Sequence, residues 1–143
     1  PVYGDGLNVR DWIYADDHCR AVDMVLHKGA AGEVYNVGSR NERPNIDVIR
    51  LLLTKVAERL DLNKDELLNL ISFVKDRQRH DRRYAINPSK AEQQLGWKPL
   101  MAFEEGIAKT VDWYIANQQW WQRIISGEYM QYYDVQYGGR LSK

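Results

Sequence analysis

One stretch, residues 73–99, restricts what this chain can fold into more than any other. Residues 75–83 hold five Lys or Arg, one His and two Asp, although the whole chain carries twenty basic and twenty acidic residues. An Asn-Pro pair at 87–88 then predicts a helix start, with Asn as N-cap and Pro at the first helical position. Gly96 predicts the end of that helix, because glycine adopts the left-handed conformation at low cost. A basic loop is therefore held between an apolar strand, predicted over 71–75, and a capped helix.

Two interpretations of this basic loop stay open from the residues alone. Most runs of charge are solvated surface, and this one has no apolar period of its own. Alternatively the loop is an anion site, because a guanidinium donates hydrogen bonds in pairs and keeps its charge, and a nearby histidine adds a donor. Binding residues tend to lie on loops positioned by a rigid scaffold. The flanking strand and helix supply such a scaffold, which favours the anion site.

Composition excludes several classes of function. A chain of 143 residues has the size of one domain, and its balanced charge disfavours nonspecific binding of nucleic acid. No apolar run approaches the ~20 residues that span a bilayer, and there is no signal-peptide pattern. Cys19 is the only cysteine, so an intrachain disulfide is impossible and a reducing, cytoplasmic location is expected. Because the chain starts at Pro1 without Met, we expect a fragment of a longer protein.

Local patterns predict the other elements. The turn Gly4-Asp5-Gly6 needs glycine at positive φ, and an extended segment is expected from Val9 to Tyr14. Asp16 or Asp17 is expected to cap a helix over 18–28. Asn45 is expected to cap a helix to Leu60. The remaining predicted elements are a strand over 33–37, a short helix within 61–70, and helices over 103–117 and 119–126.

Motifs for catalysis and for cofactor binding are absent from the sequence. The three histidines have no metal-ligand spacing, and one cysteine cannot form a thiolate site. Neither a Gly-x-Ser-x-Gly elbow nor a Walker A sequence occurs. The 4–6 turn lacks the third glycine and the following helix of a dinucleotide fingerprint. We therefore predict that this chain alone holds neither a metal nor a dinucleotide.

Three residues outside the basic loop have both an ordinary and a functional interpretation. Arg10 either forms a surface ion pair, for instance with Asp11, or reaches a phosphate. Asn45 is first of all a helix cap. Tyr137 is first of all one more packed or exposed aromatic residue.

Several segments together resemble the nucleotide-sugar enzymes of the extended short-chain dehydrogenase/reductase family. The general resemblance lies in Gly4-Asp5-Gly6, Arg10-Asp11-Trp12-Ile13-Tyr14 and Asp16-Asp17-His18. Later segments are similar to dTDP-glucose 4,6-dehydratases, and the similarity covers essentially the whole chain. These segments are 33–38, 41–42, 45–48, 76–77, 80–86, 95–99, 110–114 and 137–140.

This resemblance implies an α/β fold and an NAD-dependent activity. The chain would be the C-terminal substrate-binding domain, mostly helical with a few short strands, and the strand at 33–37 would join an N-terminal Rossmann sheet. The family converts dTDP-glucose to dTDP-4-keto-6-deoxyglucose and water on the way to deoxysugars such as the rhamnose of lipopolysaccharide. NAD and the catalytic residues would belong to the domain before Pro1, so the chain alone is expected to be inactive. The parent protein is expected to be a homodimer.

The resemblance also implies which residues contact the substrate. Pro1, Val2 and Tyr3 match a segment along the nucleotide, and Arg10 matches an arginine at the diphosphate. The other matched residues are Asn45, the loop residues Asp76, Arg77, Gln78, Arg79 and His80, and Tyr137. One departure occurs in the loop, where the family usually has Pro-Gly in place of Gln78-Arg79. At these two positions the loop therefore follows either the family's backbone path or a different one.

Two alternative functions remain at this point. One is a related enzyme of the same superfamily that uses a UDP- or GDP-sugar. The other is a binding module that kept the fold without the activity.

Overall fold

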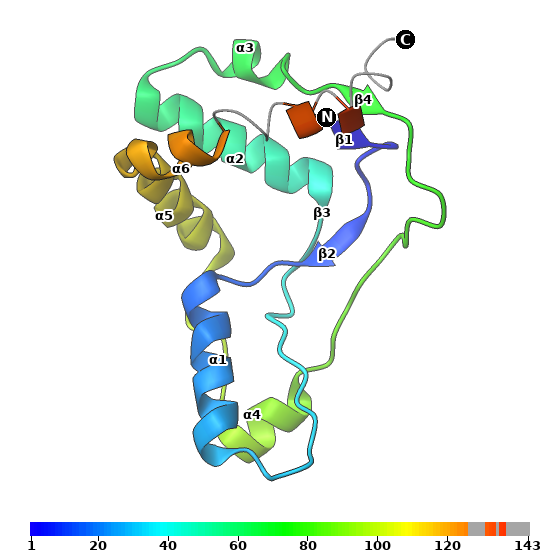
Figure 1. Cartoon of the computed structure of the whole chain (residues 1–143), viewed down its shortest axis with the longest axis vertical. Helices are drawn as coiled ribbons and strands as arrows, with labels where there is room; N and C mark the ends of the chain where they lie inside the picture. Colours follow the sequence, from blue (N-terminus) through cyan, green and yellow to red (C-terminus); the bar gives the residue numbers. More distant parts are fainter. Residues whose placement is uncertain (126–130, 134, 137–143) are drawn as a thin grey trace. The chain divides into compact units, whose positions relative to one another are not determined.

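The chain forms helices joined by loops and very short strands (Figure 1). The computed structural model describes residues 1–125, 131–133 and 135–136. Internal contacts divide the chain into two units. Unit 1 comprises Pro1–Leu7, Ile46–His80 and the described part of Ile107–Lys143, and unit 2 comprises Asn8–Asn45 and Asp81–Gly106. Helices with a few short strands agree with the predicted α/β class.

Unit 1 is built on a two-stranded parallel ladder and helices. Strand β1 (Val2–Tyr3) pairs with β4 (Phe73–Val74), so that Val2 lies opposite Phe73 and Tyr3 opposite Val74. Strand β4 is shorter than the predicted strand at 71–75. The helices of this unit are α2 (Asn45–Leu60, from Ile46 onward), α3 (Lys64–Leu68), α5 (Phe103–Ala116, from Ile107 onward) and α6 (Gln118–Ile125).

The turn after β1 requires its two glycines, as predicted. Gly4 and Gly6 have φ of +59° and +72°, where residues with a side chain are strained. A Cβ on Gly6 would lie 2.9 Å from Val2 Cγ1 and 3.0 Å from Ile46 Cβ, both of which belong to buried residues. The turn therefore closes on the start of α2, and the Ile46 N–H donates to the Gly6 carbonyl at 2.9 Å.

Unit 2 contains an antiparallel ladder and two helices. Strand β2 (Val9–Asp11) pairs with β3 (Glu42–Pro44), and Arg10 lies opposite Arg43. The helices are α1 (Ala15–Lys28) and α4 (Ser89–Leu95). Their packing buries Ala21, Ala91, Leu95 and Trp97, the last only 1% exposed. The predicted extended segment over 9–14 is thus a strand only as far as Asp11.

The start of α1 differs from the prediction. The helix begins at Ala15, and no side chain caps it. Asp17 lies within the first turn, where its buried carboxylate accepts the N–H groups of Leu100 and Met101 at 2.9–3.0 Å. Burial raises the pKa of Asp17, but the hydrogen bonds from Met101, Arg20 and Leu100 outweigh it and hold that pKa below the ordinary value. Asp17, which was expected to cap α1, instead stabilises the loop before α5.

The helix after the basic loop begins one residue later than predicted, with Pro88 and not Asn87 at the N-cap, and ends at Gly96 as predicted. Asn87 Oδ1 accepts the Ser89 N–H at 3.0 Å, so Asn87 satisfies the first turn of α4 from one position further out than expected. Gly96 follows the helix with φ +71°, in the left-handed region.

The strand predicted over 33–37 is not formed within the chain as described, and its pairing with a sheet outside this chain stays a prediction. The segment has no strand pairing in the described part of the chain, and the side chain of Val34 is 76% exposed. A β-strand needs a neighbouring backbone to accept and donate its hydrogen bonds, and sequence pattern alone does not supply that neighbour.

Candidate functional site

The pairing of β1 with β4 brings the first predicted site residues together in unit 1. The guanidinium carbon of Arg77 lies 5.2 Å from the ring centre of Tyr3, within the range of a cation–π contact. The imidazole of His80 meets the same tyrosine edge-on, with ring centres 6.2 Å apart. Tyr3, Arg77 and His80 thus form one cluster, although Tyr3 belongs to the first segment of unit 1 and the other two to its second segment.

Asp76 organises the loop of this cluster. Its Oδ1 lies 2.6 Å from His80 Nδ1 and accepts the Arg77 N–H at 2.8 Å. The hydrogen bond from His80 holds the pKa of Asp76 below its ordinary value, with help from the Arg77 N–H and despite some desolvation. The side chain of His80 is only 6% exposed. A Cβ on Gly4 would lie 2.9 Å from Asp76 Oδ2, so the glycine turn leaves room for this carboxylate.

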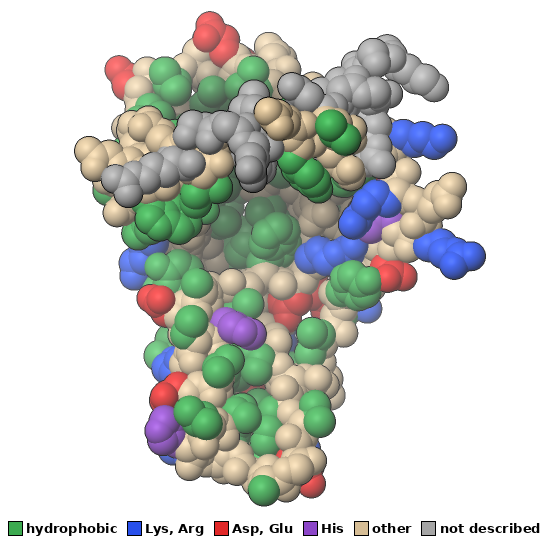
Figure 2. Space-filling view, in the orientation of Figure 1, with side chains coloured by type: hydrophobic (Ala, Val, Ile, Leu, Met, Phe, Trp, Pro, Cys, Tyr) green, Lys and Arg blue, Asp and Glu red, His purple; other side chains and the backbone are tan. Residues whose placement is uncertain are grey.

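This cluster suits binding rather than bond-making. A tyrosine ring offers a face for a base or sugar, while a guanidinium beside it offers paired donors for a phosphate. Lys and Arg side chains project along the loop that follows β4 (Figure 2). We infer an anion site with an aromatic wall, which is the second of the two interpretations of the basic loop.

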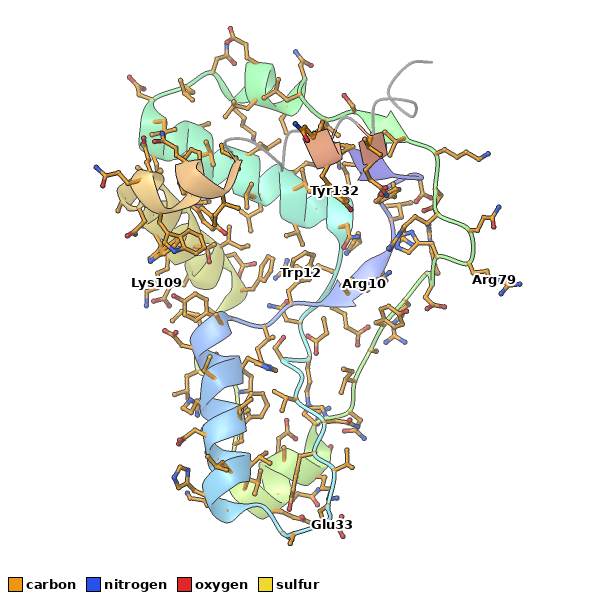
Figure 3. The ribbon with its side chains drawn as sticks, viewed as in Figure 1. Arg10, Trp12, Glu33, Arg79, Lys109 and Tyr132 are labelled. Atoms are coloured by element: carbon orange, nitrogen blue, oxygen red, sulfur yellow. The ribbon has the colours of Figure 1, made fainter. Side chains whose placement is uncertain are left out.

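The other predicted site residues of unit 1 are less well placed to contact a ligand with their side chains. Val2 is buried, so only its backbone is available to a ligand, while Pro1 is exposed. Gln78 and Arg79 form a turn, in which Arg79 has φ +56°. Its side chain points outward from the turn (Figure 3). The backbone therefore has a glycine-like conformation where the family usually has glycine, and a binding role of Gln78 and Arg79 stays a prediction. Tyr137 lies outside the described residues.

In unit 2, Arg10 lies on β2 in a well-defined environment. Its guanidinium carbon is 4.4 Å from the ring centre of Tyr84. The guanidinium N–H groups donate to the carbonyls of Val9 and Asp81 at 2.6 and 3.0 Å. The carboxylate of Asp11 accepts from the N–H groups of Ser39 and Asn41 at 2.8–2.9 Å. The described contacts of Arg10 therefore differ from the simple ion pair with Asp11.

Asn45 does not cap its helix in this structure. Its Oδ1 is buried and has no hydrogen-bond donor among the described residues. The same holds for Asn8 Oδ1, and Asn8 is 1% exposed. The backbone joins the two residues, since the Asn45 N–H donates to the Asn8 carbonyl at 3.0 Å. A buried amide oxygen without a donor is costly, which leaves a water or ligand donor to satisfy it.

The sequence also contained a signal for residues that motif reasoning missed. Asn8 and Trp12 flank β2 and alternate with Arg10 at its centre, and alternate residues of an extended segment share a face. Trp12 Nε1 is buried without an acceptor in the described part of the chain, and Figure 3 labels this residue with Arg10. The segment 8–12 thus combines a guanidinium with two buried polar atoms that have no partner among the described residues.

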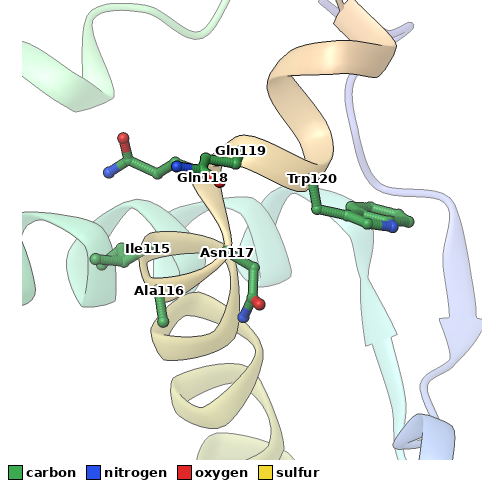
Figure 4. Close-up of a pocket in the computed structure, with 6 residues that line it drawn as sticks. All are labelled: Ile115, Ala116, Asn117, Gln118, Gln119 and Trp120. Carbon is green, nitrogen blue, oxygen red and sulfur yellow. The ribbon is translucent and has the colours of Figure 1, made fainter.

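Two hollows are lined by other residues. The larger, about 610 Å³, is lined by the consecutive residues Ile115–Trp120 at the corner between α5 and α6 (Figure 4). Its described lining contains no charged side chain and none of the predicted site residues, so these residues offer nothing for a nucleotide diphosphate. The smaller, about 330 Å³, lies in unit 2 between α1 and the segment 35–37, and its lining includes His18, Val22 and Val25. Figure 2 shows hydrophobic side chains at the surface over α1.

Neither a metal site nor a membrane-spanning helix occurs among the described residues. Among the described residues, no group of His, Cys, Asp and Glu could hold a metal ion. No helix in that part of the chain is both long and apolar enough to cross a membrane.

Comparison with known proteins identifies a family. The sequence model of the family described as GDP-mannose 4,6 dehydratase matches residues 1–110. The dTDP-glucose 4,6-dehydratase of Escherichia coli is 48% identical over 132 residues, which are 90% of this chain and 36% of that protein. The chain spans 36–38% of the length of such curated relatives.

Solved structures agree. The dTDP-glucose 4,6-dehydratase of Bacillus anthracis, in complex with NAD, is 47% identical with a TM-score of 0.73, over 86% of this chain and 36% of that one. The enzyme of the same name from Streptomyces venezuelae, also with NAD bound, is 40% identical with a TM-score of 0.76, over the same shares. The resemblance seen in the sequence motifs is confirmed.

Proposed function

Because the chain belongs to the family described as GDP-mannose 4,6 dehydratase, we propose that it is the nucleotide-sugar-binding part of an NAD-dependent dTDP-glucose 4,6-dehydratase. The name dTDP-glucose is carried by the relatives that match nearly the whole chain, whereas the family description names a GDP-sugar. The near-complete matches weigh more, because they include the segments beyond residue 110. The reaction converts dTDP-glucose to dTDP-4-keto-6-deoxyglucose and water.

The observation that carries this proposal is the cluster of Tyr3, Arg77 and His80. A nucleotide sugar offers rings for stacking and a diphosphate for charge-assisted hydrogen bonds. The cluster places an aromatic face, a guanidinium and an imidazole within one unit, at contact distances of 5.2 and 6.2 Å. Asp76 holds the imidazole by a hydrogen bond to Nδ1, so the orientation of His80 in the cluster is fixed by the loop itself.

Unit 2 contributes its own proposed contacts. Arg10 is assigned to the diphosphate and Asn45 to the nucleotide. The buried Oδ1 of Asn45 without a donor supports a ligand role over a capping role. The backbone of Pro1 and Val2, the turn Gln78-Arg79 and Tyr137 remain in the proposed substrate site on the resemblance alone.

NAD does not fit the residues of this chain. Dinucleotide sites place a glycine-rich turn between a strand and a helix. The Gly4–Gly6 turn instead joins β1 to β2, and the described strands form two separate two-stranded ladders. We therefore assign NAD and the bond-making residues to parts of the protein outside this chain, and expect the chain alone to have no activity.

The exposed hollow between α1 and residues 35–37 supports a docking site for the remainder of the protein. Val34 and Leu26 are 76% and 79% exposed, and apolar surface of this kind marks interaction sites. We propose that the protein's own N-terminal Rossmann domain covers it and that the complete protein is a homodimer.

An assay of the full-length protein tests the proposed function. Purified protein with NAD is given dTDP-glucose, UDP-glucose or GDP-mannose, and formation of the 4-keto-6-deoxy product is followed. We expect turnover of dTDP-glucose and a preference of at least about tenfold in kcat/KM, since a mismatched base leaves polar groups unpaired. Preference for GDP-mannose, the substrate in the family description, would replace the proposal with that second candidate.

A further inference from the structure

Tyr84 forms an aromatic support beneath Arg10. The guanidinium carbon lies 4.4 Å from the ring centre, closer than the 5.2 Å between Arg77 and Tyr3. A planar guanidinium stacks on an aromatic ring while its edge stays available for hydrogen bonds. The ring therefore restricts the plane of the guanidinium without using its N–H donors.

Tyr84 is itself held by hydrogen bonds at its hydroxyl and at its backbone. Its hydroxyl donates to the carboxylate of Asp81, and its backbone N–H donates to the Val9 carbonyl at 3.1 Å. The Val9 N–H donates in turn to the Arg82 carbonyl at 2.8 Å, so that Val9 forms a parallel bridge with Arg83. Residues 82–84 thus run beside β2 through an isolated parallel bridge, which places the tyrosine under the arginine.

The carbonyl of Asp81 completes the frame. It accepts Arg10 Nη2 at 3.0 Å and Asn8 Nδ2 at 3.2 Å. Because Asn8 is buried, this carbonyl is fixed in position. Arg10 is therefore fixed by a ring on its face and by carbonyls at its edge.

We propose that Tyr84 is a positioning residue that orients the Arg10 guanidinium for a nucleoside diphosphate. This inference rests on the proposed function and goes beyond it, because it assigns a role to a residue through its contact with the arginine. A long arginine side chain loses considerable rotamer freedom when it binds a ligand. The tyrosine removes much of that freedom beforehand, so its effect should appear only while Arg10 is present.

A double-mutant cycle in the full-length protein tests this coupling. The variants are Tyr84→Leu, Tyr84→Phe, Arg10→Ala and the double variant Arg10→Ala/Tyr84→Leu. Binding of dTDP is measured by calorimetry, and kcat and KM are measured with dTDP-glucose. Tyr84→Leu should weaken dTDP binding about two- to fivefold, as expected for a partly exposed cation–π contact, and should raise KM while kcat is unchanged. Tyr84→Phe keeps the ring and should stay within about twofold of wild type.

The control uses a matching pair on the neighbouring strand. Arg43 lies opposite Arg10, and its guanidinium carbon is 4.5 Å from the ring centre of Phe103. Phe103→Leu removes that stack and should leave dTDP affinity unchanged. A general effect of losing an aromatic residue would appear equally in this variant and would overturn the proposal.

The remaining outcomes distinguish failure of the positioning role of Tyr84 from failure of the proposed function. In the Arg10→Ala background, Tyr84→Leu should have no further effect on affinity, whereas an equal loss in both backgrounds would refute the positioning role. Loss in Tyr84→Phe as large as in Tyr84→Leu would also refute it. If wild type prefers UDP or GDP, the dTDP assignment fails, and the cycle is decided with the preferred nucleotide. If wild type binds none of them, the proposed function and the positioning role fall together.

Discussion

His80 Nδ1 lies 2.6 Å from Oδ1 of Asp76, four residues earlier in the same loop. The carboxylate also accepts the N–H of Arg77, so one acidic side chain holds both of the loop residues that are proposed to contact the ligand. Gly4 leaves the space that this carboxylate occupies, because a Cβ there would lie 2.9 Å from Oδ2. The loop is thus shaped from β1 as well as from its own sequence.

The Asp76–His80 pair should make stability depend on pH. The pKa of Asp76 in the folded protein lies below its ordinary value of 3.8, chiefly because His80 donates to the charged carboxylate. A lowered pKa stabilises the folded state above the unfolded value, and the effect disappears as the pH falls through the folded pKa. Urea unfolding of wild type and Asp76→Asn should therefore differ at pH 5 to 7 and converge below about 3.8. A difference that stays constant down to the folded pKa and beyond contradicts this assignment.

Replacing Arg77 should weaken substrate binding selectively. A hydrogen bond to a charged group contributes roughly 1.5–3 kcal/mol, so Arg77→Ala in the full-length protein should lose about ten- to a hundredfold in dTDP-glucose affinity. Arg77→Lys should recover part of it, because an ammonium keeps the charge without the planar fork. Titration with substrate and separately with NAD measures the effect, and NAD affinity should not change.

Arg83→Ala is the matched control for Arg77. Arg83 belongs to the same basic run, but its guanidinium is paired with Glu42 at 2.6–2.7 Å. Its loss should leave substrate affinity within about twofold, since exposed ion pairs contribute little. A larger loss with Arg83→Ala than with Arg77→Ala would show that the basic loop has been interpreted in the wrong register.

Removing the carboxylate of Asp17 should destabilise unit 2. Asp17→Ala leaves the N–H groups of Leu100 and Met101 without their acceptor, and takes a partner from Arg20 at 2.6 Å. Unpaired buried donors cost about 1–3 kcal/mol each, so we expect a loss of roughly 3 kcal/mol in the free energy of unfolding. Denaturant unfolding measures it, with Asp16→Ala as an exposed neighbour that should change stability by less than about 0.5 kcal/mol.

Arg79 offers a test of backbone strain. Its φ of +56° costs roughly 1–2 kcal/mol for a residue with a Cβ, while glycine there costs about 0.5–1 kcal/mol in chain entropy. Arg79→Gly should therefore raise stability slightly, by up to about 1 kcal/mol. Gly32→Ala is the reverse control, because Gly32 has φ +80° with open space around it, and it should destabilise.

The same Arg79→Gly variant separates strain from binding. Because the side chain points outward in Figure 3, we expect dTDP affinity to fall less than in Arg77→Ala. An equal fall in both variants would place Arg79 in direct contact with the ligand.

Features set by neighbouring residues could be predicted from the sequence. The helix from Asn45 to Leu60 has the expected bounds, and α5 ends one residue before its predicted end, because a helix forms its hydrogen bonds within its own segment. The positive φ at Gly4, Gly6 and Gly96 follows equally from a local requirement. The family also followed from sequence, since its motifs are short runs of contiguous residues.

Long-range partners were decided only by the tertiary structure. Asp17 is a residue type that often caps a helix, but its carboxylate accepts the backbone N–H groups of Leu100 and Met101 instead. Residues 33–37 have the pattern of a strand, yet no strand lies beside them in the described part of the chain. The support of Arg10 by Tyr84 arises because residues 82–84 run beside β2, a pairing that no local pattern specifies. Local hydrogen bonds and φ preferences are encoded residue by residue, whereas the partner of an exposed strand or a buried carboxylate is chosen by chain topology.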